Sequence, residues 1–286
     1  SAISALKPKL AAAAINITDT AANVTKTNVS GASSVIIKDS AVNVFKSFDA
    51  LRTLVATGPT TTIQLTDKAP AMTLTAAQYV GSTDLRAKLT GVSYTIQDTA
   101  EAIANNAQAL AGLKISVTDT SAHVQANLDA LQTFAAAGKL TTLKLTDVSK
   151  ATLSMTAQQA LRMGALSGAT LTLKDTAANI QSNFDALAAL KKVGGIELTD
   201  TARPVLQVTE VQYKKGSALL AKVTGAAVSV QFSGNASNYK IKANVDGSFT
   251  VGSANYKNVN FFAFKDATTF ADSGDASINA LLLGGT

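Results

Sequence analysis

The sequence predicts an α/β fold: a parallel β/α solenoid of about eight turns of roughly 26 residues, followed by a small all-β unit. Three observations lead to this prediction. An aspartate recurs behind short apolar stretches, helix-like apolar stripes follow many of these aspartates, and the C-terminal segment alternates between apolar and polar residues. We therefore expect an N-terminal arm at 1–12, solenoid repeats at 13–225 and a C-terminal β domain at 226–286.

The recurring aspartates are about 26 residues apart on average, a length typical of one strand and one helix per turn. They are Asp19, Asp39, Asp67, Asp98, Asp119, Asp147, Asp175 and Asp200. The stretch before each one alternates, as at 170–174 (TLTLK), which predicts a strand with one buried face. The aspartate and the Thr or Ser after it are expected at a helix start, where a side-chain oxygen accepts a free backbone N–H, an effect of about 1 kcal/mol.

Four of these units align without gaps and carry apolar residues at steps of four, three and three, which is one stripe of an α-helix. We expect one helix in each unit. The stripes are Val44, Phe48, Leu51, Leu54; Ile103, Ala107, Leu110, Leu113; Val124, Leu128, Leu131, Phe134; and Ile180, Phe184, Leu187, Leu190.

Three longer units insert a second strand before the helix, beginning at Met72, Leu153 and Leu206. Glycines mark the turns between elements, at Gly31, Gly58, Gly91, Gly138, Gly168 and Gly225. Stacked in register, such units form parallel sheet on one side and helices on the other.

From about Ala226 the period stops and the pattern becomes purely β, with strands expected at 228–232, 239–245 and 248–251. Asp246-Gly247 between alternating runs predicts a two-residue hairpin turn. We expect this unit to cap the solenoid, because an open stack exposes strand edges and apolar faces at its ends.

Three segments of this region, at 232–239 (FSGNASNY), 246–251 (DGSFTV) and 258–266 (NVNFFAFKD), resemble the C-terminal region of type I-secreted bacterial proteins of the repeats-in-toxin class. That class includes surface-layer proteins and large adhesins. The resemblance implies an extracellular or cell-surface location and a secretion signal within 226–286. The chain departs from the class in lacking the calcium-binding Gly-Gly-x-Gly-x-Asp repeats and in carrying Asn260 and Ala267 where the class has an acidic residue and glycine.

Composition excludes several classes of site. The chain has no cysteine, which rules out disulfides, thiol nucleophiles and zinc sites with sulfur ligands. The net charge of +6 is spread along the chain, its longest basic runs being Lys191-Lys192 and Lys214-Lys215, so we expect no nucleic-acid partner. No apolar run reaches the roughly 18 residues of a membrane span, and we expect none.

The only histidine, His123, would have to be the base of any Ser-His-Asp triad. It occupies the slot filled by Asn23, Asn43 and Asn179 in sister repeats, so we expect a helix-surface substitution, no catalytic residue and no cofactor. Asp49, Asp129 and Asp185 recur ten residues after the first aspartate and are candidate calcium ligands. Helix-start capping or solvation is the favoured alternative.

These observations predict a non-enzymatic extracellular structural protein that self-associates into a surface layer, filament or matrix. The alternative is an adhesin-type module whose Thr-rich strand faces, at 60–66 and 141–146, recognise glycan or another surface. The candidate subunit contacts are apolar residues near the two ends of the chain. They are Ala11, Ala12, Ala13, Ile15, Ile278, Leu281, Leu282 and Leu283.

Overall fold

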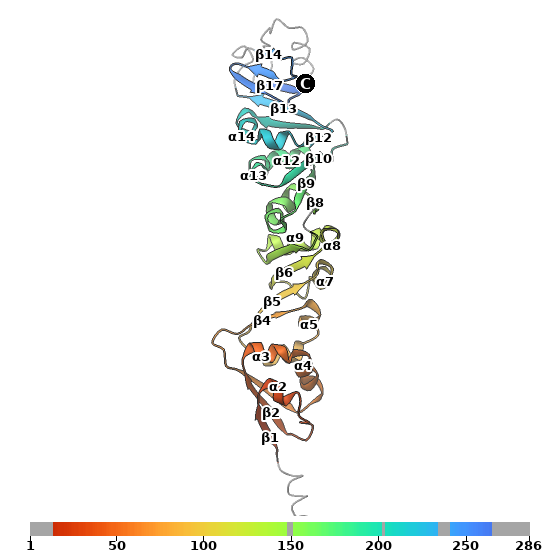
Figure 1. Cartoon of the computed structure of the whole chain (residues 1–286), viewed down its shortest axis with the longest axis vertical. Helices are drawn as coiled ribbons and strands as arrows, with labels where there is room; N and C mark the ends of the chain where they lie inside the picture. Colours follow the sequence, from red (N-terminus) through yellow and green to blue (C-terminus); the bar gives the residue numbers. More distant parts are fainter. Residues whose placement is uncertain (1–13, 148–150, 202–203, 234–240, 265–286) are drawn as a thin grey trace, which may run out of the picture. The chain divides into compact units, whose positions relative to one another are not determined.

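The computed structural model describes residues 14–147, 151–201, 204–233 and 241–264. The chain is a mixed α/β protein with several parallel sheets, and short helices follow most of the strands (Figure 1). It divides into two compact units, Ser1–Thr118 with Ala137–Thr142 and Asp119–Ala136 with Leu143–Thr286.

The strands up to Leu145 form two parallel sheets. One has the strand order β1 (Asn16–Asp19), β2 (Ser34–Asp39) and β3 (Thr60–Leu65). The other has the order β4 (Ala71–Leu74), β5 (Ser93–Asp98), β6 (Lys114–Asp119) and β7 (Leu140–Leu145). The helices between these strands are α2 (Ala21–Val24), α3 (Ala41–Lys46), α4 (Phe48–Thr57), α5 (Ala76–Val80), α6 (Thr83–Lys88) and α7 (Ala100–Asn105).

The second unit begins with helices α8 (Ser121–Ala126) and α9 (Leu128–Ala136). Its first parallel sheet has the order β12 (Val223–Thr224), β10 (Val193–Leu198), β9 (Thr170–Asp175) and β8 (Thr152–Met155). Its remaining helices are α10 (Ala157–Gln159), the π-helix η1 (Ala160–Gly164), α11 (Ala165–Ser167), α12 (Ala177–Ser182), α13 (Phe184–Ala188) and α14 (Glu210–Leu220).

A second parallel sheet of this unit joins β11 (Val205–Thr209), β13 (Ala227–Phe232) and β17 (Phe261–Phe264). Strand β13 pairs parallel with β11 over its length, so the change of pattern at Ala226 does not interrupt the parallel sheet. The expectation of a separate, purely β C-terminal unit is therefore too simple. Among the described strands, antiparallel pairing is confined to the meander of β14 (Ile241–Ala243), β15 (Phe249–Val251) and β16 (Ala254–Tyr256).

The hairpin predicted at Asp246-Gly247 is present, but its turn is longer than the two residues expected, because the N–H of Gly247 donates to the carbonyl of Asn244 and the paired residues closest to the loop are Ala243 and Phe249. The hairpin connects β14 to β15, and Gly247 adopts a φ of 74°, a left-handed conformation that glycine reaches without a steric penalty. The Asp246 carboxylate accepts hydrogen bonds from the backbone N–H and the hydroxyl of Ser248 (3.1 and 2.6 Å), which stabilises the turn locally.

The strands bury alternate side chains, as the period-two pattern predicts. Val35 and Ile37 of β2, and Leu171 and Leu173 of β9, are buried, while their neighbours Ile36 and Thr172 are half-buried on the opposite face. The core consists mainly of such aliphatic side chains, supplemented by the buried stripe residues of the helices.

The prediction of one helix per simple unit is wrong in a systematic way. The stripe is divided between two short helices at Ser47, Asn127 and Asn183, where φ is between −117° and −106° and ψ is about 10°. The side chains of Asn127 and Asn183 donate to the carbonyl oxygens of residues 123 and 179 (2.9 and 2.8 Å), which competes with continued helical bonding. In the unit after Asp98, turns follow α7 in place of a second helix.

Candidate functional site

The recurring aspartates connect neighbouring turns within each unit. In Asp39, Asp98 and Asp175 one carboxylate oxygen accepts the N–H of the next residue in the aspartate's own turn. In six of the aspartates the carboxylate accepts the N–H of the first helical residue of the preceding turn at 2.5–3.1 Å. We call this set of contacts the aspartate ladder. Its links are Asp39 to Ala21, Asp67 to Ala41, Asp98 to Ala76, Asp147 to Ser121, Asp175 to Ala157 and Asp200 to Ala177.

The ladder explains why both Asp and Thr or Ser recur. The hydroxyl of the second residue caps its own helix, as Thr176 does by accepting the N–H of Asn179 at 3.2 Å. The carboxylate takes up a further N–H of the neighbouring helix, which would otherwise have no acceptor. The expected capping role is confirmed, and the structure adds a link between turns.

The hydrogen bonds of the ladder also lower the pKa of some of its aspartates. Although burial raises the pKa of Asp39, hydrogen bonds from Asn43, Ser40 and Ala21 outweigh it and lower that pKa below its ordinary value of 3.8. The pKa of Asp147 is lowered by the side-chain and backbone hydrogen bonds of Ser121. Both carboxylates are therefore held in the ionised, accepting form at neutral pH.

His123 lies where sister turns have asparagine. Its Nδ1 is 2.8 Å from Asp119 Oδ1, and the amides of Asn43 and Asn179 donate to the equivalent aspartates at 2.7 and 2.6 Å. Its side chain is 64% exposed, and no serine hydroxyl bonds to it among the residues that the structure describes. The Asp-His pair thus reproduces a structural contact and lacks the nucleophile of a triad.

The three candidate calcium ligands each lie in the first turn of a helix, α4, α9 or α13. Asp49 and Asp129 accept hydrogen bonds from the amides of Gln78 and Gln159 at 3.4 and 2.8 Å. Each glutamine closes a capping box at the start of the next helix. Within the described ranges, no three acidic or histidine side chains gather in a geometry that could hold a metal ion.

Of the candidate subunit contacts, only Ile15 lies within the described residues, and its side chain is 46% exposed. Ala11, Ala12, Ala13, Ile278, Leu281, Leu282 and Leu283 lie outside them. Ile15 leads into β1, which pairs on one side with β2 and ends its sheet. At this edge Asp19 binds Thr20 and Asn23 of its own turn, and no helix N–H of another described turn reaches it.

The Thr-rich strand faces are partly exposed. Thr60 and Thr62 of β3 and Thr141 and Thr142 of β7 are exposed, but the Thr141 hydroxyl donates to the carbonyl of Ile115 at 2.9 Å. Thr61 is buried and donates to the carbonyl of Pro59 at 2.9 Å.

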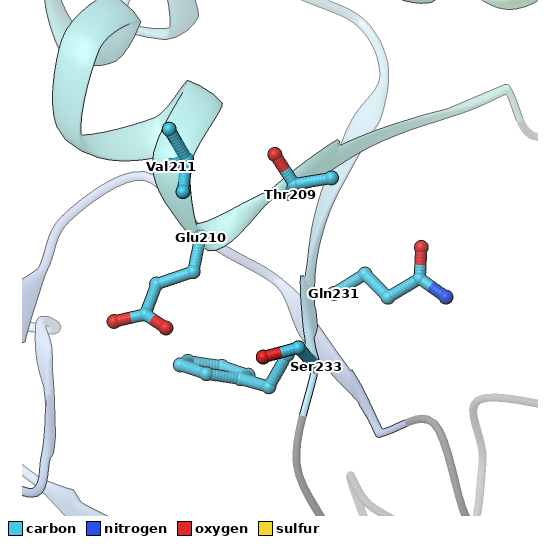
Figure 2. A pocket seen from close by; sticks show the side chains of 6 residues that line it. Thr209, Glu210, Val211, Gln231 and Ser233 are labelled. Carbon is cyan, nitrogen blue, oxygen red and sulfur yellow. The ribbon is translucent and has the colours of Figure 1, made fainter.

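A pocket of about 300 Å³ lies at the start of α14, between Thr209, Glu210, Val211 and the end of β13 (Figure 2). Figure 2 shows the Glu210 side chain extending from the helix start and Ser233 beside it, while Gln231 points away. The Glu210 carboxylate accepts from Lys214 Nζ at 2.6 Å and from Tyr256 Oη at 3.2 Å.

These contacts limit the chemistry of this pocket. The carboxylate of Glu210 accepts from Lys214 and Tyr256, and no hydrogen bond joins it to Ser233 among the described residues. His123 does not line the pocket. The arrangement can hold a small polar group but does not assemble a nucleophile with a general base. Sequence reasoning missed Glu210 and Tyr256 because they are 46 residues apart, and no periodic signal links them.

The same pocket marks the end of the ladder. Strands β11 and β13 pair Thr209 with Gln231, so the next residues, Glu210 and Phe232, lie opposite each other. Glu210 is the first residue of α14, and in the other turns an aspartate lies opposite the first helical residue. Phe232 is buried, with its ring 5.6 Å from that of Tyr256 and 5.9 Å from that of Phe262. Aromatic packing thus replaces the aspartate at this position.

No helix in the described part of the chain is long and apolar enough to cross a membrane. Comparisons with protein-family models, curated proteins and solved structures found no match to this chain.

Proposed function

We propose that this chain is a non-enzymatic extracellular structural protein that self-associates into a surface layer, filament or matrix. The observation that carries the proposal is the aspartate ladder. Each added turn joins the preceding one by a parallel strand pair and an aspartate-to-helix link, as β2 and Asp39 do with β1 and Ala21. The chain therefore builds structure by repeating one contact, and the same contact geometry suits continuation between copies.

The repeat supports a finer architecture. The ladder positions recur in both compact units with the same partners, which favours a single series of about eight β/α turns. A series of this kind ends in unpaired strand edges. Strand β1, at the edge of its sheet among the described strands, is the edge that we assign to self-association.

The extracellular location rests on composition and on the resemblance of 232–266 to type I-secreted proteins. The absence of cysteine and the abundance of Ser and Thr fit an exported bacterial protein. The described part of the resembling region contains the Asp246-Gly247 hairpin and Asn260, whose side chain accepts the N–H of Val228 at 2.8 Å.

An adhesin is the second candidate function, and the exposure of Thr60, Thr62 and Thr142 favours it. Hydroxyls regularly placed on strands can donate to and accept from sugar hydroxyls. This reading predicts a monomer with measurable glycan affinity.

Light scattering and negative-stain microscopy of the purified chain, with and without millimolar calcium, separate the two candidates. Ordered polymers support the structural function, and their dependence on calcium would assign a role to Asp49, Asp129 and Asp185. A monodisperse monomer in both conditions contradicts self-association and favours the adhesin.

A matched pair of variants tests the assigned edge. The carbonyl of Ile15 accepts the N–H of Ser33 on the β2 side, and backbone groups of alternate residues face alternate edges, so the N–H of Thr18 faces the open edge. Thr18→Pro removes that donor, whereas Thr18→Val keeps it. We expect the proline variant alone to lose association, with the circular dichroism spectrum unchanged; association by both variants would exclude the β1 edge.

A further inference from the structure

A second pocket, of about 490 Å³, lies in the second unit where the π-helix ends. Its walls are backbone and small side chains at Gly164 and Ala165, the Leu171 side chain at the start of β9, and Leu190 after α13. Lys191 and Lys192 complete the lining, and both are exposed.

The pocket coincides with a shortening of the repeat. In the three long units the first paired residues of successive strands are Ala71 and Ser93, Thr152 and Thr170, and Val205 and Ala227. The middle unit is thus four residues shorter than the other two, which is about one turn of α-helix. The helical segment of this unit contains η1, and such π-helical turns are rare and often found at functional sites.

The local packing shows how the chain accommodates the shortening. A Cβ on Gly164 would lie 2.6 Å from Leu171 Cδ1, so the backbone of η1 rests directly on that leucine. Gly168 adopts a φ of 67° to turn into β9. The helical segment of this unit (157–167) is as long as α14, so the residues that it lacks belong to the connection to the next strand, which is 168–169 here and 221–226 before β13. Gly168 of this short connection lines the pocket beside Leu190.

The charged residues that line the pocket are all positive. Lys192 Nζ donates to the carbonyl of Gly168 at 2.5 Å, which holds the ammonium group at the pocket. No carboxylate lines the pocket, and neither lysine has an ion-pair partner among the described residues. Apolar walls with two uncompensated cations fit a ligand with an apolar body and an anionic end.

We propose that this pocket binds a medium-chain alkyl carboxylate, with the chain between Ala165, Leu171 and Leu190 and the carboxylate at Lys191 and Lys192. The volume lies within the range of small-molecule sites, about 300–1,000 Å³. The site does not depend on self-association, because all its lining residues belong to one unit of one chain.

Equilibrium dialysis of the full chain against labelled decanoate tests the proposal, since this readout is independent of assembly. Decanol and acetate are the probes that lack the charge and the chain respectively. We expect saturable binding of decanoate about tenfold tighter than that of decanol, because each of two exposed charge pairs adds up to about fivefold. Decanoate should also bind more tightly than acetate, because acetate buries no alkyl chain. The absence of saturable decanoate binding, or equal binding of decanol, overturns the proposal.

Variants localise the site. Ala165→Trp fills the pocket and should abolish binding, and Ala189→Phe, at a second lining position, serves if the first variant does not fold. Lys191→Gln with Lys192→Gln should weaken decanoate about tenfold and leave decanol unchanged. Lys222→Gln, an exposed lysine before the next strand, is the matched control. Unchanged decanoate binding in the filled variant refutes the assignment. The assignment is also refuted if the chain binds anionic phospholipid vesicles but does not bind decanoate.

Discussion

Replacing Asp39 by alanine tests the aspartate ladder at one of its buried links. Asp39 is 8% exposed, and its carboxylate accepts three hydrogen bonds. Two come from its own turn, from the Ser40 N–H at 2.8 Å and the Asn43 amide at 2.7 Å. The third comes from the N–H of Ala21, at 3.1 Å, in the preceding turn, and Ala21 is fully buried.

The loss should be about 3 kcal/mol in the free energy of unfolding. A buried donor left without an acceptor costs about 1–3 kcal/mol, and loss of a helix-start acceptor costs about 1 kcal/mol. The contributions do not add fully, because the three bonds share one carboxylate. Asp39→Asn keeps one acceptor oxygen and should lose about half as much.

Urea unfolding at pH 7 measures the total, and hydrogen exchange locates it. Protection of the Ala21 amide should fall by about two orders of magnitude in Asp39→Ala, since 1.4 kcal/mol corresponds to a factor of ten. Asp84→Ala is the control, because Asp84 is exposed in the first turn of α6 in the same unit. A loss within about 0.5 kcal/mol of that control, with Ala21 still protected, would refute the ladder as a stabilising device.

Three further predictions follow from individual contacts. Hydrogen bonding lowers the pKa of Asp39 below 3.8, so the stabilisation by its carboxylate is complete above that pH and is lost as pH falls through the folded-state pKa. In urea unfolding measured between pH 2 and 6, the free energy of unfolding should therefore fall less steeply at acid pH in Asp39→Asn than in the unmodified chain. An equal fall in both proteins would contradict this. Gly216→Ala should destabilise by about 1–3 kcal/mol in thermal melts, because its Cβ would lie 2.4 Å from the Phe184 ring, whereas Gly195→Ala, with its nearest neighbour at 3.9 Å, is the tolerated control. His123→Asn restores the residue of sister turns and should change stability by less than about 0.5 kcal/mol, so a larger loss would show that the imidazole has a role of its own.

Several features of the fold could be predicted because they depend on neighbours in sequence. The alternation in 170–175 predicts β9, and Thr176 with its following apolar residues predicts the start of α12. The hairpin at Asp246-Gly247 belongs to the same group, since its turn residues act within a few positions. Helix continuity was less predictable: the apolar stripe passes through Asn183 unchanged, although this residue ends α12 by binding the carbonyl of Asn179.

The aspartate links and the two pockets depend on the register in which the strands pair, and they could not be predicted from neighbours in sequence. The separation of strand starts decides which aspartate reaches which helix, and it varies from 18 residues between β1 and β2 to 26 between β2 and β3. The Glu210–Tyr256 contact and the pocket at Lys191 and Lys192 arise from segments brought together by that register.

The sequence by itself therefore determined the repeated unit: a strand with one buried face, an aspartate, a capping hydroxyl and an apolar stripe, all set by local backbone preferences and burial of alternate residues. The tertiary structure decided what each aspartate joins, where the ladder stops at Phe232, and where a four-residue shortening leaves a pocket beside Leu190. The physical reason is the distance along the sequence over which each interaction acts. A side chain's local conformation follows from its neighbours along the chain, whereas the second oxygen of a carboxylate is satisfied by whichever backbone N–H the stacking of turns brings within hydrogen-bonding distance.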